Sequence, residues 1–308
     1  MQYNNLFSPS KLKDIFNQYN IKPRKSLGQN FLIDRNIVNK IIDAARLSKK
    51  DTVVEVGAGL GVLTVPMAQT ARQVIAYEID ERLAPILREA VAEYENVEIV
   101  NEDVLENVKC QNPNVKSMSK SKCQINNISN TRSYKVVGNL PYYITSRILR
   151  HFLSAEHKPQ SIIITIQKEV AERICAKPPQ MSLLSASVQV FGRPQIIAQV
   201  SKNCFWPMPQ VDSAIVRIDL KTIQELLMTE EERQFFIIVK AGFSSKRKML
   251  LNNLRQKLGG EKIQWEEIFS QAGLKPTIRA QEMGVEEWKR LLNGKFQMSN
   301  QIQNPNVK

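Results

Sequence analysis

A glycine-rich turn at residues 55–61, EVGAGLG, restricts the possible folds of this chain more than any other segment. The apolar run 52–54 leads into it, so a buried strand is predicted to end in a turn that opens a helix. Glycines suit this turn because the backbone must bend sharply and approach a ligand without side chains in the way. The spacing is G-x-G-x-G, and the third glycine of the dinucleotide fingerprint would fall on Val62. The turn therefore favours a nucleotide-like ligand other than NAD, with a plain tight connection as the alternative.

Short apolar strand patterns alternate with amphipathic helix patterns over the first 220 residues. In residues 35–47, for example, apolar side chains recur every three to four positions, which is typical of a helix with one buried face. Such alternation favours an α/β fold with a Rossmann-like, mostly parallel sheet. The strand patterns occupy residues 51–57, 71–80, 97–104, 134–143, 161–170 and 213–220.

Two acidic residues stand at the ends of the two strand patterns that follow the glycine turn. Glu78 closes the first of these strands and Asp103 closes the second. The carboxyl ends of parallel strands meet at one edge of a doubly wound sheet, beside the glycine turn. There Glu78 can accept hydrogen bonds from both hydroxyls of a ribose, and Asp103 can accept one from the adenine amine of a bound cofactor.

The fourth strand pattern ends in the tetrapeptide Asn139–Leu140–Pro141–Tyr142. An exocyclic adenine amine is a poor nucleophile because its lone pair is delocalised into the ring. The Asn139 side-chain carbonyl and the main-chain carbonyl before Pro141 can both accept the amine hydrogens, aim the lone pair at a methyl sulfonium and stabilise the developing charge. Pro141 fixes the loop and removes a competing donor, and Tyr142 can stack on a base that has left its neighbours. The alternative is a proline turn with an incidental aromatic residue.

The formal net charge of +13 favours a polyanionic partner such as nucleic acid, although some proteins are merely basic. The four cysteines form no CxxC pair and the two histidines lack metal-ligand spacing, so neither a disulfide scaffold nor a metal site is expected. The chain has no run of eighteen apolar residues and no apolar block near residue 1. We expect a cytoplasmic, monomeric protein with no membrane segment.

Three regions depart from the strand–helix alternation. Residues 109–133 are rich in Asn, Ser and Lys, which predicts an inserted surface loop. From Thr229 onward the pattern is helical, and Thr229 with Glu232 forms a potential capping box. The predicted division is a sheet-containing domain at 1–221, a small all-helical domain at 222–295 and a disordered tail at 296–308.

With these motifs in place, the chain resembles the ribosomal RNA adenine N6,N6-dimethyltransferases, which modify two adjacent adenosines near the 3′ end of small-subunit rRNA. The resemblance covers about residues 22–292 and implies a class I methyltransferase domain, with S-adenosylmethionine as cofactor and a helical C-terminal domain. It rests on KPRKSLGQNFL at 22–32, VVEVGAGLGVLT at 53–64, YEID at 77–80, GNLPYYITS at 138–146, IQKEVAERI at 166–174, FWPMPQVDSAIVR at 205–217 and AGFSSKRKMLLNNL at 241–254.

The resemblance implies a role for individual residues by their positions in these motifs. In the interpretation without the resemblance, Asn30 and Leu32 only pack at a helix entry, and Phe205 is a core residue. The implied cofactor contacts are Asn30, Leu32, Gly57, Gly59, Glu78, Asp103 and Asn139. The implied catalytic and target-base residues are Asn139, Leu140, Pro141, Tyr142 and Phe205, with Phe205 as a second aromatic residue opposite Tyr142.

The chain departs from the usual family pattern at residues 109–133, where the connection is commonly tighter, and in PPQMSLLS at 178–185, which lacks a Tyr-Gly. Its basic stretch reads SSKRK at 244–248 where Gln-Arg-Arg-Lys is more usual, so guanidinium geometry is partly changed. The residues expected to contact RNA phosphates in the helical domain are Lys246, Arg247, Lys248 and Arg255. A solvated helix face is the alternative for each of them.

The expected function is therefore transfer of methyl groups from S-adenosylmethionine to N6 of two adjacent adenosines in small-subunit (16S) rRNA, during biogenesis of the small subunit. Two alternatives stay open at this point. The first is an adenine methyltransferase of the same build that acts on large-subunit rRNA or on DNA. The second is a ribosome-assembly binding factor with little catalysis, although the intact Glu78 and Asn139–Tyr142 favour activity.

Overall fold

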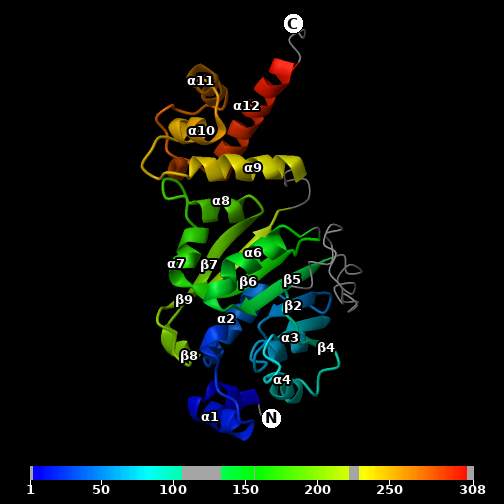
Figure 1. Cartoon of the computed structure of the whole chain (residues 1–308). Helices are drawn as coiled ribbons and strands as arrows, with labels where there is room; N and C mark the ends of the chain where they lie inside the picture. Colours follow the sequence, from blue (N-terminus) through cyan, green and yellow to red (C-terminus); the bar gives the residue numbers. More distant parts are fainter. Residues whose placement is uncertain (1–2, 106–132, 156, 222–228, 304–308) are drawn as a thin grey trace, which may run out of the picture. The chain divides into compact units, whose positions relative to one another are not determined.

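The described part of the chain contains a mostly parallel sheet of seven strands, in the order β4-β3-β2-β5-β6-β9-β7 (Figure 1). This computed structural model describes residues 3–105, 133–155, 157–221 and 229–303. The strands are β2 (Thr52–Val56), β3 (Gln73–Tyr77), β4 (Val97–Val100), β5 (Tyr134–Asn139), β6 (Ser161–Gln167), β7 (Gly192–Val200) and β9 (Ser213–Leu220). The strands β4 to β6 are parallel and β9 runs antiparallel to β6, so the predicted α/β sheet is confirmed.

Helices connect these strands, as the sequence pattern predicts. Strands β2 and β6 are almost entirely buried, which is why apolar residues such as Val53, Val54 and Ile162–Ile164 follow one another in them without alternation. The connecting helices are α2 (Arg35–Ala45), α3 (Thr64–Thr70), α4 (Ala84–Ala90), α6 (Thr145–Leu153) and α7 (Lys168–Ile174). The Asp34 carboxylate caps α2 by accepting hydrogen bonds from the amides of Asn36 and Ile37.

The register of the sheet aligns three strand ends that matter for function. Val56 of β2 pairs with Tyr77 of β3 on one side and with Gly138 of β5 on the other. The residues that follow these partners are Gly57, Glu78 and Asn139. Because all three strands run in the same direction, these three residues leave the sheet at the same carboxyl edge.

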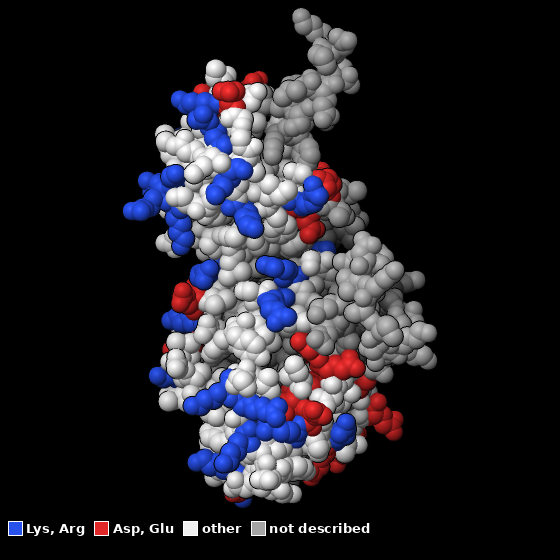
Figure 2. Space-filling model, viewed as in Figure 1, with Lys and Arg blue, Asp and Glu red and all other residues white. Residues whose placement is uncertain are grey.

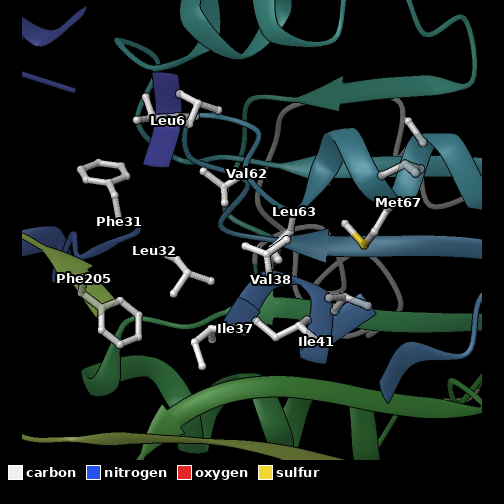
Figure 3. Packing of buried hydrophobic residues seen from close by; sticks show 14 of the residues in the cluster. Leu6, Phe31, Leu32, Ile37, Val38, Ile41, Val62, Leu63, Met67 and Phe205 are labelled. Carbon is white, nitrogen blue, oxygen red and sulfur yellow. The ribbon is translucent and has the colours of Figure 1, made fainter. Parts of the chain in front are cut away.

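A hydrophobic cluster beside the sheet holds this edge in place. Side chains of α2, including Ile37 and Ile41, pack into it together with Leu63 and Met67, as Figure 3 shows. The two-residue strands β1 (Phe31–Leu32) and β8 (Phe205–Trp206) pair antiparallel, with Leu32 opposite Phe205. Full burial of each aliphatic side chain contributes roughly 1.5–3 kcal/mol, so this cluster fixes β1 firmly against the sheet.

Some elements have weak sequence signals and were not predicted. The sequence pattern predicts no element before residue 35, yet the structure has η1 (Tyr3–Phe7) and the helix α1 (Pro9–Gln18) there. Ser8 caps α1, and Leu12 and Phe16 are buried on its inner face. Strand β7 contains Pro194, which a sheet tolerates there because β7 is the edge strand.

The described chain divides into two compact units, one of residues 1–171 with 194–220 and the other of residues 172–193 with 221–308. The second unit contains α8 (Leu183–Gln189), α9 (Thr229–Gly242), α10 (Leu250–Leu258), α11 (Lys262–Gln271), η7 (Ala280–Glu282) and α12 (Val285–Gln303). Phe235, Phe269 and Trp288 are fully buried inside it. Residues 172–193, which the sequence pattern placed in the first domain, therefore belong to the helical unit.

The structure differs from the sequence-based expectation at the C-terminus. A disordered tail was expected at 296–308, but α12 continues to Gln303. The helix starts from a buried segment around Trp288 and Leu291, and no proline interrupts it before Pro305. The expected surface loop at 109–133 lies almost wholly outside the described residues, as do 304–308. No described helix is long and apolar enough to cross a membrane.

Candidate functional site

One pocket opens at the carboxyl edge of the sheet, where β2, β3 and β5 end. Its wall contains every residue that the sequence predicts to contact a cofactor or a target base. They are Asn30, Leu32, Gly57, Gly59, Glu78, Asp103, Asn139, Leu140, Pro141, Tyr142 and Phe205. These residues come from six separate chain segments, so the fold brings together what the sequence only suggested.

The glycine turn and Glu78 form one side of the pocket. Gly57 and Gly59 have φ values of +76° and +58°, the left-handed region that favours glycine. The amide of Gly57 donates to the carbonyl of Tyr77, and the amide of Gly59 donates to Glu78 Oε2 at 2.7 Å. Burial raises the pKa of Glu78, while hydrogen bonds from the amides of Asp80 and Gly59 oppose the rise. The turn and the carboxylate therefore hold each other in place.

A second carboxyl group, Glu55, lies beneath the turn. It is completely buried, and Thr64 Oγ1 donates a hydrogen bond of 2.6 Å to its Oε2. Burial raises the pKa of Glu55 to about 8, the hydrogen bond from Thr64 opposes this, and the nearby Glu78 adds to it. Glu55 therefore holds a proton over much of the neutral range.

Asp103 lies on the loop after β4, on the same wall as Glu78. Its Oδ1 accepts a hydrogen bond of 2.9 Å from the amide of Leu105, which orients the carboxylate. The side chain of Asn101 donates to the main-chain carbonyl of Glu78 at 2.6 Å and ties this loop to β3. Two carboxylates thus face one pocket from neighbouring strand ends, a suitable arrangement for the hydroxyl and amine donors of a nucleoside.

The corner formed by Asn139, Leu140 and Pro141 lines the pocket at the end of β5, beside the glycine turn. Asn139 Nδ2 donates to the main-chain carbonyl of Asn30 at 3.0 Å. This bond uses the donor side of the amide, so the Oδ1 acceptor remains for a ligand. The amide of Leu140 donates to the carbonyl of Thr165 on β6, and its side chain is buried, which anchors the corner to the sheet.

Two aromatic side chains border this corner. Tyr142 is half-buried, and its hydroxyl lies 2.8 Å from the hydroxyl of the fully buried Ser213 at the start of β9. Burial raises the pKa of Tyr142, the hydrogen bond with Ser213 lowers it and the charge of Asp212 raises it. Phe205 is only 3% exposed and belongs to the hydrophobic cluster as well as to the pocket wall (Figure 3). Ser213 lies in the motif FWPMPQVDSAIVR at 205–217, but the sequence alone does not indicate its contact with Tyr142.

A polar network behind the pocket was also missed by sequence reasoning. Gln29 Nε2 donates to Asp80 Oδ2 at 2.8 Å, and Gln29 Oε1 accepts from the amide of Arg24 at 2.7 Å. Arg82 binds both oxygens of the same carboxylate, at 2.6 and 2.8 Å. Burial raises the pKa of Asp80, but the hydrogen bonds from Arg82 and Gln29 outweigh it and lower the pKa overall. The amide of Asp80 in turn donates to Glu78 Oε1 at 2.8 Å.

This network connects Glu78 with Asn139 through hydrogen bonds and one peptide link. Glu78 is bonded to Asp80, Asp80 to Gln29, and Gln29 is followed by Asn30, whose carbonyl holds Asn139. The signal in the sequence was the polar Gln29 between Gly28 and Asn30, but nothing in the local pattern indicates its partner 51 residues away.

The predicted RNA contacts lie in the other unit and are described by themselves. Lys246, Arg247 and Lys248 are exposed on the connection between α9 and α10, and Arg255 on α10 is partly exposed. Figure 2 shows lysine and arginine side chains on the visible faces of both units. The fully buried Asn253, which sequence reasoning missed, donates from Nδ2 to the carbonyls of Gly242 and Ser245 and so fixes the connection. Among the described residues, no group of His, Cys, Asp or Glu is placed to hold a metal ion.

Comparison with known proteins agrees with this geometry. Residues 20–295 match the family model described as ribosomal RNA adenine dimethylase. The chain is 40% identical over 282 residues to "Ribosomal RNA small subunit methyltransferase A" of Dehalococcoides mccartyi, covering 92% of this chain and 91% of the relative. It is 38% identical to the protein of the same name from Enterococcus faecalis, covering 94% of this chain and 96% of the relative.

Solved structures show the same fold. The crystal structure of the 23S rRNA methyltransferase ErmE has a TM-score of 0.67 and 28% identity, covering 86% of this chain and 99% of that one. A dimethyladenosine transferase from Plasmodium falciparum has a TM-score of 0.70 and 22% identity, covering 87% and 97%. With a family match over residues 20–295, the chain belongs to the ribosomal RNA adenine dimethylase family.

Proposed function

We propose that this protein transfers methyl groups from S-adenosylmethionine to N6 of two adjacent adenosines near the 3′ end of small-subunit rRNA, giving N6,N6-dimethyladenosine. The observation that carries the proposal is the single pocket that holds both the Asn139–Pro141 corner and the Gly57–Glu78 wall. A base amine held at the corner and a cofactor held at the wall would meet inside it. The protein would act in the cytoplasm, on immature small ribosomal subunits.

The residues of the wall fit S-adenosylmethionine. Gly57 and Gly59 present backbone without side chains, so a ligand can lie directly against the turn. The buried Glu78 would accept hydrogen bonds from the ribose hydroxyls, and Asp103 would accept one from the adenine amine. Asn30 and Leu32 would complete the site from the β1 side. When bound, this cofactor supplies an electrophilic methyl group attached to a positively charged sulfur.

The corner would orient the target amine. Asn139 Oδ1 and the main-chain carbonyl of Leu140 can each accept one N6 hydrogen, which points the nitrogen lone pair into the pocket. The bond from Asn139 Nδ2 to Asn30 fixes the amide before the substrate arrives, so little reorganisation is needed. Pro141 fixes the backbone at the corner and has no amide hydrogen of its own to donate there.

Tyr142 and Phe205 would enclose the base. The hydrogen bond with Ser213 limits rotation of the Tyr142 ring, which prepares it for stacking on an extruded adenine. Phe205 packs against β1 and cannot easily move away from the pocket. Lys246, Arg247, Lys248 and Arg255 would bind RNA phosphates in the helical unit, which would serve as the RNA-binding domain.

The main competing function is methylation of large-subunit rRNA. The solved 23S rRNA methyltransferase is 28% identical to this chain, whereas the relatives named for the small subunit are 38 and 40% identical over similar lengths. The higher identity favours the small subunit. A binding factor with little catalysis is disfavoured, because Glu78 and Asn139 are both in place in one pocket.

A methyl-transfer assay with purified subunits tests the proposal. Purified protein and tritiated S-adenosylmethionine are incubated with immature small subunits that lack the modification, and in parallel with large subunits. We expect labelled dimethyladenosine in small-subunit rRNA alone. Label confined to large-subunit rRNA would favour the competing function, and no label in either would leave the binding-factor hypothesis.

A further inference from the structure

An exposed aromatic side chain stands next to the catalytic corner and has no role in the function described so far. Tyr143 lines the mouth of the pocket and is 58% exposed, whereas its neighbour Tyr142 is half-buried. An exposed tyrosine alone needs no explanation, but one on the rim of a pocket that would take a base is a potential contact for nucleic acid.

The Tyr143 ring is supported from one side. A Cβ atom placed on Gly28 would lie 3.4 Å from both Cδ1 and Cε1 of Tyr143 and 3.2 Å from Cβ of Pro141. Gly28 has a φ of +59°, so this position favours glycine, and the lack of a side chain lets the ring approach the backbone. Tyr143 also sits within the short η4 turn (Tyr142–Ile144), where the amide of Ile144 donates to the carbonyl of Pro141. The ring is therefore held in place before any ligand binds.

Positive charge lies on both sides of this ring along the chain. Arg147 is exposed, lines the same pocket and follows Tyr143 by four residues at the start of α6. Lys25, which is also exposed, precedes Gly28 in the segment that supports the ring, whereas the neighbouring Arg24 is paired with Asp80 at 3.8 Å. An exposed aromatic side chain with basic residues near it in the chain suits a stacked nucleobase and the phosphates on either side of it.

We propose that Tyr143 is a stacking platform for the nucleobase next to the target adenosine. This inference rests on the proposed function, in which one of two adjacent adenosines enters the pocket. Extruding that base breaks its stacking with its neighbour, which then needs a new partner at the pocket mouth. The exposed ring of Tyr143 would stack on the neighbouring base at the mouth of the pocket, while Tyr142 would stack on the extruded adenine inside it.

Kinetics with immature small subunits give the first test. For Tyr143→Ala the KM for subunits should rise by about 5- to 150-fold, the loss expected for one base–aromatic stack, with kcat changed much less. Tyr143→Phe keeps the ring and should stay within about twofold of the wild type. Met208→Ala removes a 60% exposed apolar side chain that does not line the pocket and serves as the control. A wild-type KM for Tyr143→Ala, or an equal loss for Tyr143→Phe, would overturn the assignment.

A second experiment identifies which base is stacked. Affinities are measured for RNA hairpins with the 3′-terminal small-subunit rRNA sequence, carrying an abasic site at the flanking or at the target position. The Tyr143→Ala loss should disappear with the flanking abasic site and persist with the target one, whereas the reverse result would refute the proposal. If wild-type protein methylates no small subunits, the proposed function fails; if it does and the hairpin affinities are insensitive to Tyr143, only this inference fails.

Discussion

The side-chain amide of Asn139 donates a hydrogen bond to the main-chain carbonyl of Asn30, with the two atoms 3.0 Å apart. The two residues are 109 positions apart in the chain, and both line the pocket. The bond gives the asparagine one orientation, with its oxygen left for the ligand. The position and orientation of the Asn139 side-chain amide therefore depend on Asn30 and the segment that contains it.

The role of Asn139 predicts a loss of rate on truncation. Asn139→Ala removes an acceptor that acts on the amine as charge develops, so the single-turnover rate should fall by about 10²–10³-fold, by analogy with oxyanion-hole donors. Asn203→Ala, at an exposed asparagine outside the pocket, serves as the matched control and should keep the wild-type rate. An Asn139→Ala rate equal to that of the control would contradict the role.

The network behind the pocket predicts coupling between Gln29 and Asp80. Each of Gln29→Ala and Asp80→Asn weakens the support of the carbonyl that holds Asn139, and the double variant should lose less than the sum. We expect a coupling energy of about 0.5–3 kcal/mol in the single-turnover rate. Gln69→Ala combined with Asp80→Asn is the control pair, because Gln69 bonds to Tyr94 instead. Additive losses for Gln29 and Asp80 would show that the bond does not position the corner.

The buried Glu55 predicts a pH-dependent stability. Its pKa is about 8 in the folded protein against an ordinary value of 4.5, so the folded state keeps a proton that the unfolded state releases. Its stabilising contribution is complete below pH 4.5 and is lost as the pH rises through 8. The free energy of unfolding of the wild type should therefore fall relative to Glu55→Gln over this range.

Denaturant titrations at pH 6 to 9 measure this difference for the cofactor-free protein. Glu95→Gln, at an exposed carboxylate, should follow the wild type throughout. Parallel stability curves for the wild type and Glu55→Gln would mean that Glu55 is ionised in the folded protein.

The basic connection between α9 and α10 predicts a change in salt dependence. Lys246→Ala should weaken RNA binding and reduce the slope of log affinity against log salt by about one phosphate contact. Lys262→Ala is a matched control, because it also removes one charge but from a lysine paired with Glu266 at 3.4 Å. An unchanged slope for Lys246→Ala would mark this residue as solvated surface.

Much of the site could be predicted because several of its residues lie at the ends of strands. Gly57 and Glu78 each follow a buried strand and Asn139 ends one, and parallel strands bring such residues to one edge whatever the side chains between them. The fold class was predictable for the same reason: continuous apolar strands alternate with amphipathic helices.

The remaining features of the site and fold depend on contacts between residues far apart in the chain, which the periodicity of the sequence does not reveal. The bonds of Gln29 with Asp80 and of Tyr142 with Ser213 join residues 51 and 71 positions apart, and each requires the folded backbone. Strand β7 contains a proline, and its sequence GRPQIIAQV does not alternate apolar with polar residues although its burial does, so it gives little strand signal. The continuation of α12 to Gln303 follows from a helix that starts on a buried face, not from the polar residues after it.

Mass spectrometry of nucleosides from small-subunit rRNA, in cells with and without this protein, tests the central claim most directly. The account predicts N6,N6-dimethyladenosine at two adjacent positions near the 3′ end when the protein is present. It predicts unmodified adenosine at both positions when the protein is absent or carries Asn139→Ala. Equal amounts of dimethyladenosine in all three samples would contradict it.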